Sequence, residues 1–94
     1  MPTLRDIVNE LDELDEDATI YTDGRSPAAQ AIVLDVRDAA TAKEAGLRYF
    51  LEVALAREAI DVWSAWREGA EPTVDDKLVA IAYYAENDAY LPLD

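Results

Sequence analysis

The sequence predicts an α+β fold: a small antiparallel sheet of two to three strands with three helices packed on one face, in the order α-β-β-(β)-α-α. Apolar residues recur at helical spacing near the N-terminus and again in two long segments of the second half. Between them, two short runs rich in β-branched residues flank the turn sequence "DGRSP". Because 51% of the 94 residues are apolar, we expect one globular domain over residues 1–94.

The first half is expected to contain one helix and a hairpin. Thr3 followed by Asp6 resembles a capping box, and apolar residues at helical spacing then favour an amphipathic helix over residues 4–14. Residues 18–22 and 31–36 are expected to form the two strands of the hairpin. Residues 37–46 are polar and are interpreted as a connection that has room for a helical turn.

Residues 47–53 fit either a strand or a helix. Alternating apolar residues favour a third strand, followed by a helix over residues 54–68 that buries Trp63 and Trp66. One long helix from Leu47 is the alternative. Gly69 and Pro72 end this region, and Thr73 is expected to cap a last helix over residues 74–88.

The last expected helix is apolar on every side in its middle, "LVAIAYYA". Such a helix lies centrally in the fold or presents its second face to another chain. Tyr84 and Tyr90 are therefore candidate anchors for a homodimer or for another partner, because tyrosine is favoured at interfaces. The tail, residues 90–94, is expected to be coil.

Several chemistries are excluded by composition. The chain has no cysteine and no histidine, so it lacks a thiol nucleophile, a histidine-based catalytic triad and every site with these metal ligands. Its three glycines are too scattered for a phosphate-binding loop, and the acidic stretch lacks the spacing of a calcium loop. We therefore expect no enzyme activity, no cofactor and no metal, with a divalent-cation binder as the least favoured alternative.

Neither a secretory signal nor a membrane-spanning segment is expected. The start lacks a basic region followed by an apolar stretch, and the longest uninterrupted apolar run covers only residues 78–85. These features predict a cytoplasmic protein without membrane contact.

The net charge of −13 is concentrated at the two ends of the chain. Residues 1–17 hold seven acids and one base, and residues 68–94 hold the same numbers, while the middle is nearly neutral. This charge disfavours direct binding of nucleic acid and favours association with a positively charged surface.

The acidic stretch of the N-terminal region is the main candidate site. If the first helix runs on to Asp17, its acids form rows along one face with spacings of about 5 to 6 Å, which permits mimicry of nucleic acid phosphates. Asp15, Glu16 and Asp17 would then lie at the helix C-terminus, where the helix dipole disfavours acids. The candidate partner-binding residues are Glu10, Asp12, Glu13, Asp15, Glu16 and Asp17, with Glu86 and Asp88 as a second set.

The segments "YFLEVALAREAIDVW" and "AYYAENDAY" resemble a group of small uncharacterised prokaryotic proteins that also begin with an acidic amphipathic helix. The resemblance implies a bacterial or phage origin and supplies no activity or functional residue. In composition, the chain also resembles small acidic immunity proteins, antitoxins and phage anti-defence inhibitors. The expected function is thus a non-enzymatic inhibitor that occupies a basic surface of a nucleic-acid-handling enzyme or toxin. The alternative is a homo-oligomeric structural or accessory domain whose acids only provide solubility.

Overall fold

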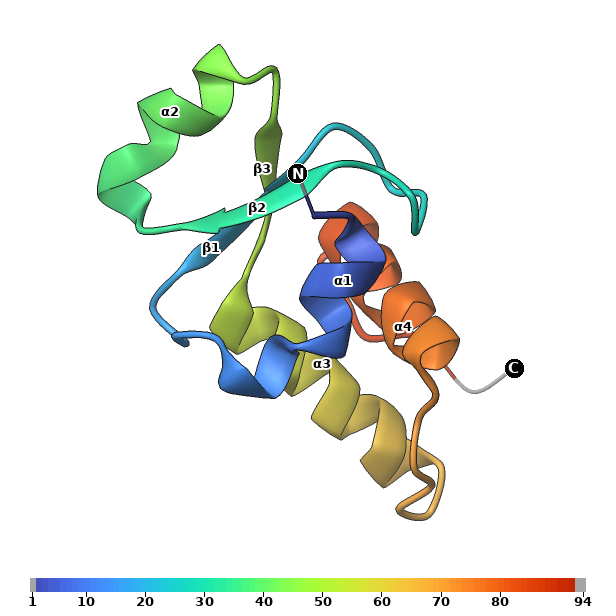
Figure 1. Cartoon of the computed structure of the whole chain (residues 1–94). Coiled ribbons are helices and arrows are strands. Elements are labelled where there is room, and N and C mark those ends of the chain that lie inside the picture. Colours follow the sequence, from blue (N-terminus) through green and yellow to red (C-terminus); the bar gives the residue numbers. More distant parts are fainter. Residues whose placement is uncertain (1, 93–94) are drawn as a thin grey trace.

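The computed structural model of this chain describes residues 2–92, which form a three-stranded antiparallel sheet and four α-helices (Figure 1). β1 (Thr19–Thr22) is the central strand, between β2 (Ala31–Leu34) and β3 (Arg48–Glu52). The register pairs Thr22 with Ala31 on one side and with Arg48 on the other. All four residues of β1 are buried because the strand has a neighbour on both sides and helices over both faces.

The third strand settles the choice left open for residues 47–53. β3 pairs with β1 along its length, and helix α3 (Val53–Trp66) follows it directly. The alternative of one long helix from Leu47 is therefore wrong. The chain turns at Glu52, whose extended backbone conformation separates the strand from the helix. The expectation that this helix buries Trp66 is wrong, since 46% of Trp66 is exposed.

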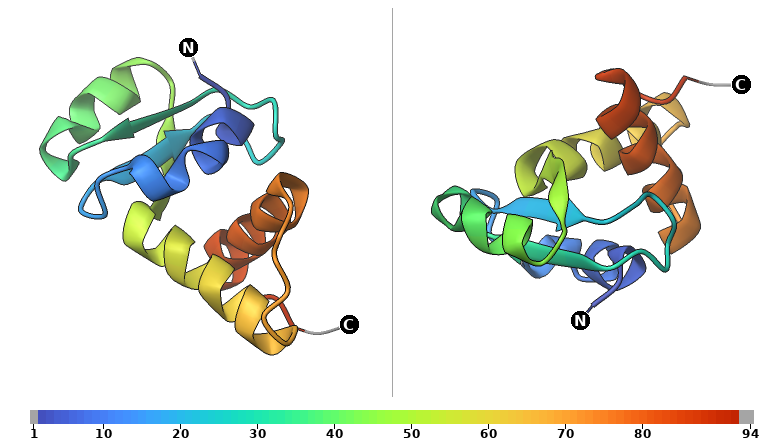
Figure 2. Two further views of the ribbon diagram at one scale, coloured as in Figure 1. Left: turned by 60° about the horizontal axis from the view of Figure 1, so that its bottom comes forward. Right: turned by 90° about the horizontal axis from the view of Figure 1, so that it is seen from above.

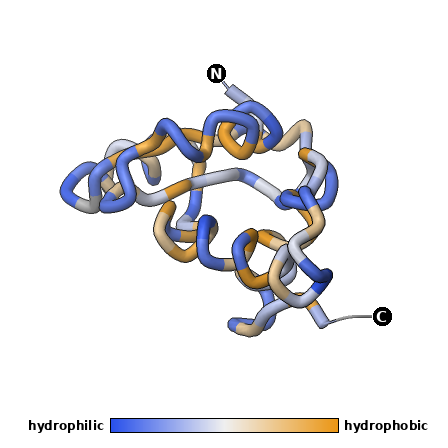
Figure 3. The backbone as a smooth tube through the Cα atoms, turned by 90° about the horizontal axis from the view of Figure 1, so that it is seen from below, coloured by the Kyte–Doolittle hydropathy of each residue, from blue (hydrophilic) through white to orange (hydrophobic). Residues whose placement is uncertain are grey.

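The main core lies between the sheet and three helices, α1 (Leu4–Asn9), α3 and α4 (Val74–Asn87). Figure 3 shows apolar stretches recurring along the backbone of these helices, interrupted by hydrophilic ones. The largest completely buried side chains are those of Leu4, Val8, Ile20, Val53 and Ile81. The sheet and three of the helices thus share one continuous apolar contact region.

The opposite face of the sheet is covered by α2 (Ala39–Glu44), so the expectation that all helices lie on one face is wrong. A 3₁₀ turn (Val36–Asp38) leads into α2, which lies apart from the other helices (Figures 1 and 2). The predicted polar connection is a helix because Ala42 is buried against Tyr21 and Leu47. One small residue on a polar segment gives too weak a periodicity to be detected in the sequence.

The first helix ends much earlier than its apolar spacing predicts. α1 stops at Asn9, and a 3₁₀ turn (Leu11–Glu13) follows. The capping box at its start is confirmed, because the Thr3 amide donates to Asp6 Oδ2 at 2.9 Å and the Asp6 amide donates to Thr3 Oγ1. The same motif, formed by Thr73 and Asp76, starts α4.

The C-terminal residues follow α4 without regular structure. Tyr90 packs on other aromatic rings, and the Pro92 carbonyl accepts a hydrogen bond from Arg67 at 3.2 Å. The expectation of coil holds for residues 90–92, and its remaining part, Leu93 and Asp94, lies outside the described residues.

Candidate functional site: an acidic loop

The acidic loop, residues 10–17, connects α1 to the start of β1 (Figure 1). All six of its acidic side chains are exposed. The loop is a series of turns: the Leu14 amide donates to the Leu11 carbonyl at 3.2 Å, and the Ala18 amide donates to the Asp15 carbonyl at 3.0 Å. Asp15 Oδ1 also accepts a hydrogen bond from the Asp17 amide at 2.9 Å.

This geometry overturns the arrangement of carboxylates expected from a longer helix. Because α1 ends at Asn9, the acids beyond it do not form rows along one helix face. For the same reason Asp15, Glu16 and Asp17 do not lie at a helix C-terminus, and the helix dipole does not act on them as proposed. The acids gather instead on one turn-rich loop.

Arg57 of α3 fixes the backbone of the acidic loop. Its Nε and Nη2 donate to the Leu11 carbonyl at 3.2 and 2.9 Å, and Nη2 also donates to the Leu14 carbonyl. Because the α-helix has already ended, neither carbonyl accepts an α-helical hydrogen bond, and the Leu11 carbonyl can accept from Arg57 in addition to the Leu14 amide. The guanidinium therefore satisfies backbone groups of the loop, and it leaves the loop's carboxylates without a salt bridge from this arginine.

Two leucines attach the same loop to the core. Leu11 is 2% exposed, and Leu14 is half-buried and packs against the core. With Leu11 buried, Leu14 packed against the core and both of their carbonyls bound to Arg57, the loop is held at two points. The carboxylates between them project from an ordered backbone.

None of the six acids of the acidic loop takes part in an ion pair within residues 2–92. The ion pairs of that region are Arg5 with Asp75, Arg25 with Glu86, and Arg37 with Asp35. The carboxylates of the loop therefore have no direct ion-pair partner among the described residues, although the Arg57 guanidinium lies against the loop's backbone.

Glu86 and Asp88 lie at the end of α4 and do not belong to the acidic loop. The Glu86 carboxylate is 3.2 Å from Arg25 Nη1, so its charge already has a partner. Asp88 is the C-cap of α4, with a left-handed backbone at φ 53° and its amide bonded to the Tyr84 carbonyl. Both side chains are exposed. The structure thus separates these two candidates from the first six.

A groove of about 290 Å³ runs beside the acidic loop, between α3 and the segment that leads into α4. Three carboxylates and an apolar floor line it: Asp12, Asp61, Glu71, Leu11, Ile60 and Pro72. Arg57, which is bound to backbone carbonyls, and Lys77 complete its walls. The groove extends the acidic surface onto α3.

The contributions of Asp61, Glu71 and Arg57 were not predicted from the sequence. Their positions are far from the acidic loop in the chain, and no local pattern links them to it. The one usable signal was Arg57 itself, a cation that with Glu58 interrupts the mainly apolar run "VALAREAI". A half-buried arginine in such a run is expected to bind acceptors from another segment.

The two tyrosines expected to anchor a partner contact each other. The ring centroids of Tyr84 and Tyr90 are 5.2 Å apart, and the Tyr90 ring meets the Trp66 ring edge-on at 5.9 Å. A hydrogen bond with the Glu58 carboxylate raises the pKa of the Tyr90 hydroxyl. Both tyrosines are half-buried, so part of their area is used within the chain.

Within the described part of the chain, no three acidic side chains are grouped closely enough to hold a metal ion together. None of the helices in residues 2–92 has the length and apolar character that a membrane crossing requires.

The fold and the acidic loop define this molecule as a small α+β domain with an ordered, strongly negative surface. The chain belongs to the family described as Domain of unknown function (DUF7716), whose model matches residues 1–93. No curated protein and no solved structure matches it. The family brings no activity to the chain, which agrees with the resemblance to uncharacterised proteins.

Proposed function

We propose that this chain is a non-enzymatic inhibitor that uses its acidic loop to occupy a basic surface of a partner protein. The observation that carries the proposal is the set of six exposed carboxylates on one ordered loop, none of them ion-paired within residues 2–92. Surfaces that bind nucleic acid are strongly basic, because they neutralise phosphate groups. The proposed partner is accordingly a nucleic-acid-handling enzyme or toxin, as for immunity proteins, antitoxins and anti-defence proteins.

The charge and the order of the acidic loop both support this role. An uncompensated patch steers a basic partner and raises the association rate. A loop that is already ordered also loses little conformational entropy when it binds. Leu11 and Arg57 supply that order before any partner arrives.

The groove beside the acidic loop offers a place for one basic side chain of the partner. The carbon atoms of a lysine or arginine would lie over Ile60 and Pro72, and its charged end would meet Asp12, Asp61 or Glu71. Such a contact would add specificity to the long-range attraction. The proposed role needs no cofactor and no direct contact with nucleic acid or membrane, and we place it in the cytoplasm, where such partners work.

The test compares two variants that remove the same charge. The loop variant carries Asp12→Asn, Glu13→Gln and Glu16→Gln, and the control variant removes three exposed acids elsewhere, Asp38, Glu44 and Glu68, by the same type of substitution. We expect the wild-type chain and the control to capture a partner from cell lysate at low salt and to lose it at high salt. The loop variant should capture none. Equal capture by all three chains would contradict the proposal.

A homo-oligomeric accessory domain is the second candidate, favoured by one observation on α4. Val79 is 56% exposed on this helix, whereas its neighbours Leu78 and Ala80 are buried. A second copy could cover this face. Light scattering tests it: a dimer that Val79→Glu converts to a monomer supports this candidate, and a monomeric wild-type chain removes it.

A further inference from the structure

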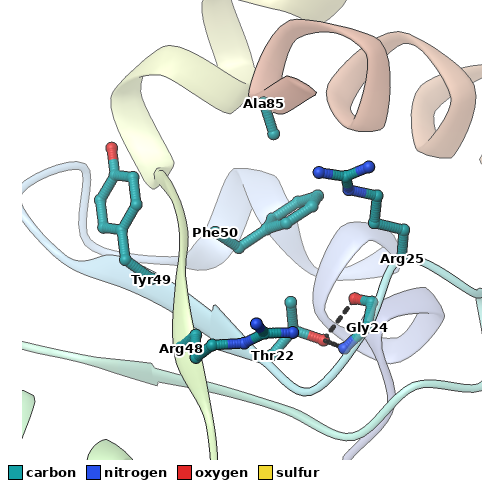
Figure 4. Close-up of a pocket in the computed structure, with 7 residues that line it drawn as sticks. All are labelled: Thr22, Gly24, Arg25, Arg48, Tyr49, Phe50 and Ala85. Carbon is teal, nitrogen blue, oxygen red and sulfur yellow. Dashed lines mark hydrogen bonds between the residues drawn. The ribbon is translucent and has the colours of Figure 1, made fainter. Parts of the chain in front are cut away.

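A second pocket lies at the other end of β1 and has the opposite electrostatic character. It has a volume of about 240 Å³, and six of its lining residues are Thr22, Gly24, Arg25, Arg48, Phe50 and Ala85 (Figure 4). Two arginines and no acidic residue line it. In a chain of net charge −13, such a local surplus of positive charge requires an explanation.

The sheet and the following turn bring these residues together. Arg48 begins β3 and pairs in register with Thr22, the last residue of β1. The Thr22 hydroxyl lies 2.9 Å from the Gly24 carbonyl and 2.8 Å from the Gln30 carbonyl, and it accepts a hydrogen bond from the Gly24 amide. These contacts fix the turn from which Arg25 projects, so this wall of the pocket is formed in advance.

Figure 4 shows how the side chains are placed. Arg25 and Arg48 come from different segments and lie on the side of β3 to which the Phe50 ring points, while the Tyr49 ring lies on the other side. Phe50 is only 6% exposed, and Ala85 of α4 is half-buried above it. The apolar part of the pocket is therefore small, and charge dominates its recognition.

The guanidinium groups of Arg25 and Arg48 differ in whether they have an ion-pair partner. Among residues 2–92, Arg48 has no ion-pair partner and its side chain donates no hydrogen bond. Arg25 pairs with Glu86, but the two side chains are 58% and 57% exposed, so water and salt weaken this pair. An incoming anion would compete with Glu86 for Arg25 and find Arg48 unopposed.

We propose that this pocket binds the phosphate or carboxylate group of a compact small ligand, with a short apolar part of the ligand on Phe50 and Ala85. Guanidinium groups suit both anions because their donors match the geometry of carboxylate and phosphate oxygens. The pocket lies beyond the end of β1 opposite to the acidic loop, so this proposal stands or falls independently of the inhibitor role.

The test is a titration of the ¹⁵N-labelled chain, followed by the amide signals of Gly24, Arg25 and Arg48. The probes are inorganic phosphate, phenyl phosphate, benzoate and, as a neutral control, phenol. We expect saturable shifts of these signals with phenyl phosphate or benzoate and none with phenol. The response to phosphate esters compared with carboxylates identifies which anion the pocket prefers, and inorganic phosphate shows whether the apolar part contributes.

Two variants should change the affinity in opposite directions. Arg48→Gln should weaken binding about tenfold by removing a charge-assisted contact. Glu86→Gln should strengthen it about twofold to fivefold by releasing Arg25 from its ion pair. Arg37→Gln is the matched control, because Arg37 pairs with Asp35 outside the pocket, and it should leave the affinity unchanged.

All substituted residues are exposed, so the variants are expected to fold, which circular dichroism checks. The proposal is overturned by an absence of saturable shifts with every anion, by phenol binding as well as phenyl phosphate, or by a folded Arg48→Gln chain that binds as tightly as wild type.

Discussion

The two loops that flank β1 differ in how many of their charged side chains have a partner within residues 2–92. In the acidic loop before the strand, six exposed carboxylates have no ion pair within residues 2–92. In the loop after it, residues 23–30, Asp23 accepts a hydrogen bond from the Gln30 amide at 3.0 Å and Arg25 pairs with Glu86. The comparison teaches that the count of charges in a sequence does not tell which of them remain available at the surface.

The two regions are also held by different means. The acidic loop depends on one buried side chain, Leu11, and on one distant cation, Arg57. The second loop is held by hydrogen bonds of the Thr22 hydroxyl and by backbone hydrogen bonds from the start of α1 to the Pro27 and Ala29 carbonyls. Substitutions that act on one mechanism and spare the other can therefore break or sharpen the comparison.

Removal of the apolar anchor should have the largest effect. Leu11→Ala should lower the free energy of unfolding by about 3 kcal/mol, because it deletes a buried leucine and leaves a cavity. Leu14→Ala should cost clearly less, since Leu14 is only half-buried. Urea denaturation measures both. Equal losses for the two leucines would mean that Leu11 is not the main anchor of the loop.

Loss of the Arg57 guanidinium should have the second-largest effect on the free energy of unfolding. Arg57→Leu removes the guanidinium donor from the Leu14 carbonyl and leaves the Leu11 carbonyl with only the Leu14 amide, so it should lower the free energy of unfolding by about 2 kcal/mol. Arg37→Leu is the control, because its exposed pair with Asp35 should contribute less than about 1 kcal/mol. Urea denaturation measures both. If the two substitutions lower the free energy of unfolding equally, Arg57 of α3 does not stabilise the acidic loop.

Neutralising three carboxylates of the acidic loop should change the free energy of unfolding by less, and should raise it. The loop variant with Asp12→Asn, Glu13→Gln and Glu16→Gln should raise the free energy of unfolding by about 0.5 kcal/mol, because it relieves repulsion between neighbouring like charges. The gain should shrink as salt screens that repulsion. The control variant at Asp38, Glu44 and Glu68 should gain less. Equal gains would show that only the net charge of the chain matters.

Removal of the Asp6 carboxylate, which caps α1, should have the smallest effect on the free energy of unfolding. This effect should depend on pH. The Thr3 amide and hydroxyl hold the pKa of Asp6 below its ordinary value of 3.8. The folded chain thus binds this proton more weakly than the unfolded chain does, so the stabilisation is complete above 3.8 and is lost as the pH falls through the lower folded value.

Denaturation of wild type and Asp6→Ala at a series of pH values checks this. The difference in stability should be present at neutral pH and should narrow in acid. Asp12→Ala, which removes an acid of the loop, should show no such loss at neutral pH. A difference for Asp6→Ala that stays constant down to the lowest pH would contradict the role of the charged carboxylate.

Local patterns predicted much of the fold. Alternating apolar residues gave β3, β-branched runs gave β1 and β2, and the Thr3 and Thr73 caps marked helix starts. These features depend on residues only a few positions apart, so the local spacing of residues in the sequence is enough to predict them.

The candidate site was predicted less well, because its geometry depends on contacts between distant residues. The spacing of Leu11 and Leu14 continues that of α1, yet α1 ends at Asn9, and Arg57 of α3 binds the two leucine carbonyls. Likewise, the pairing of Glu86 with Arg25 joins positions in different halves of the chain. The sequence thus located the acids but not their partners.

The most direct test of the inhibitor role is the affinity of a captured and purified partner for three chains: wild type, the loop variant and the control variant. The loop and control variants carry the same net charge, so any difference in dissociation constant measured by calorimetry belongs to the loop. The account predicts binding at least about tenfold weaker for the loop variant and within about twofold of wild type for the control. Equal weakening of both variants, or none in either, would contradict it.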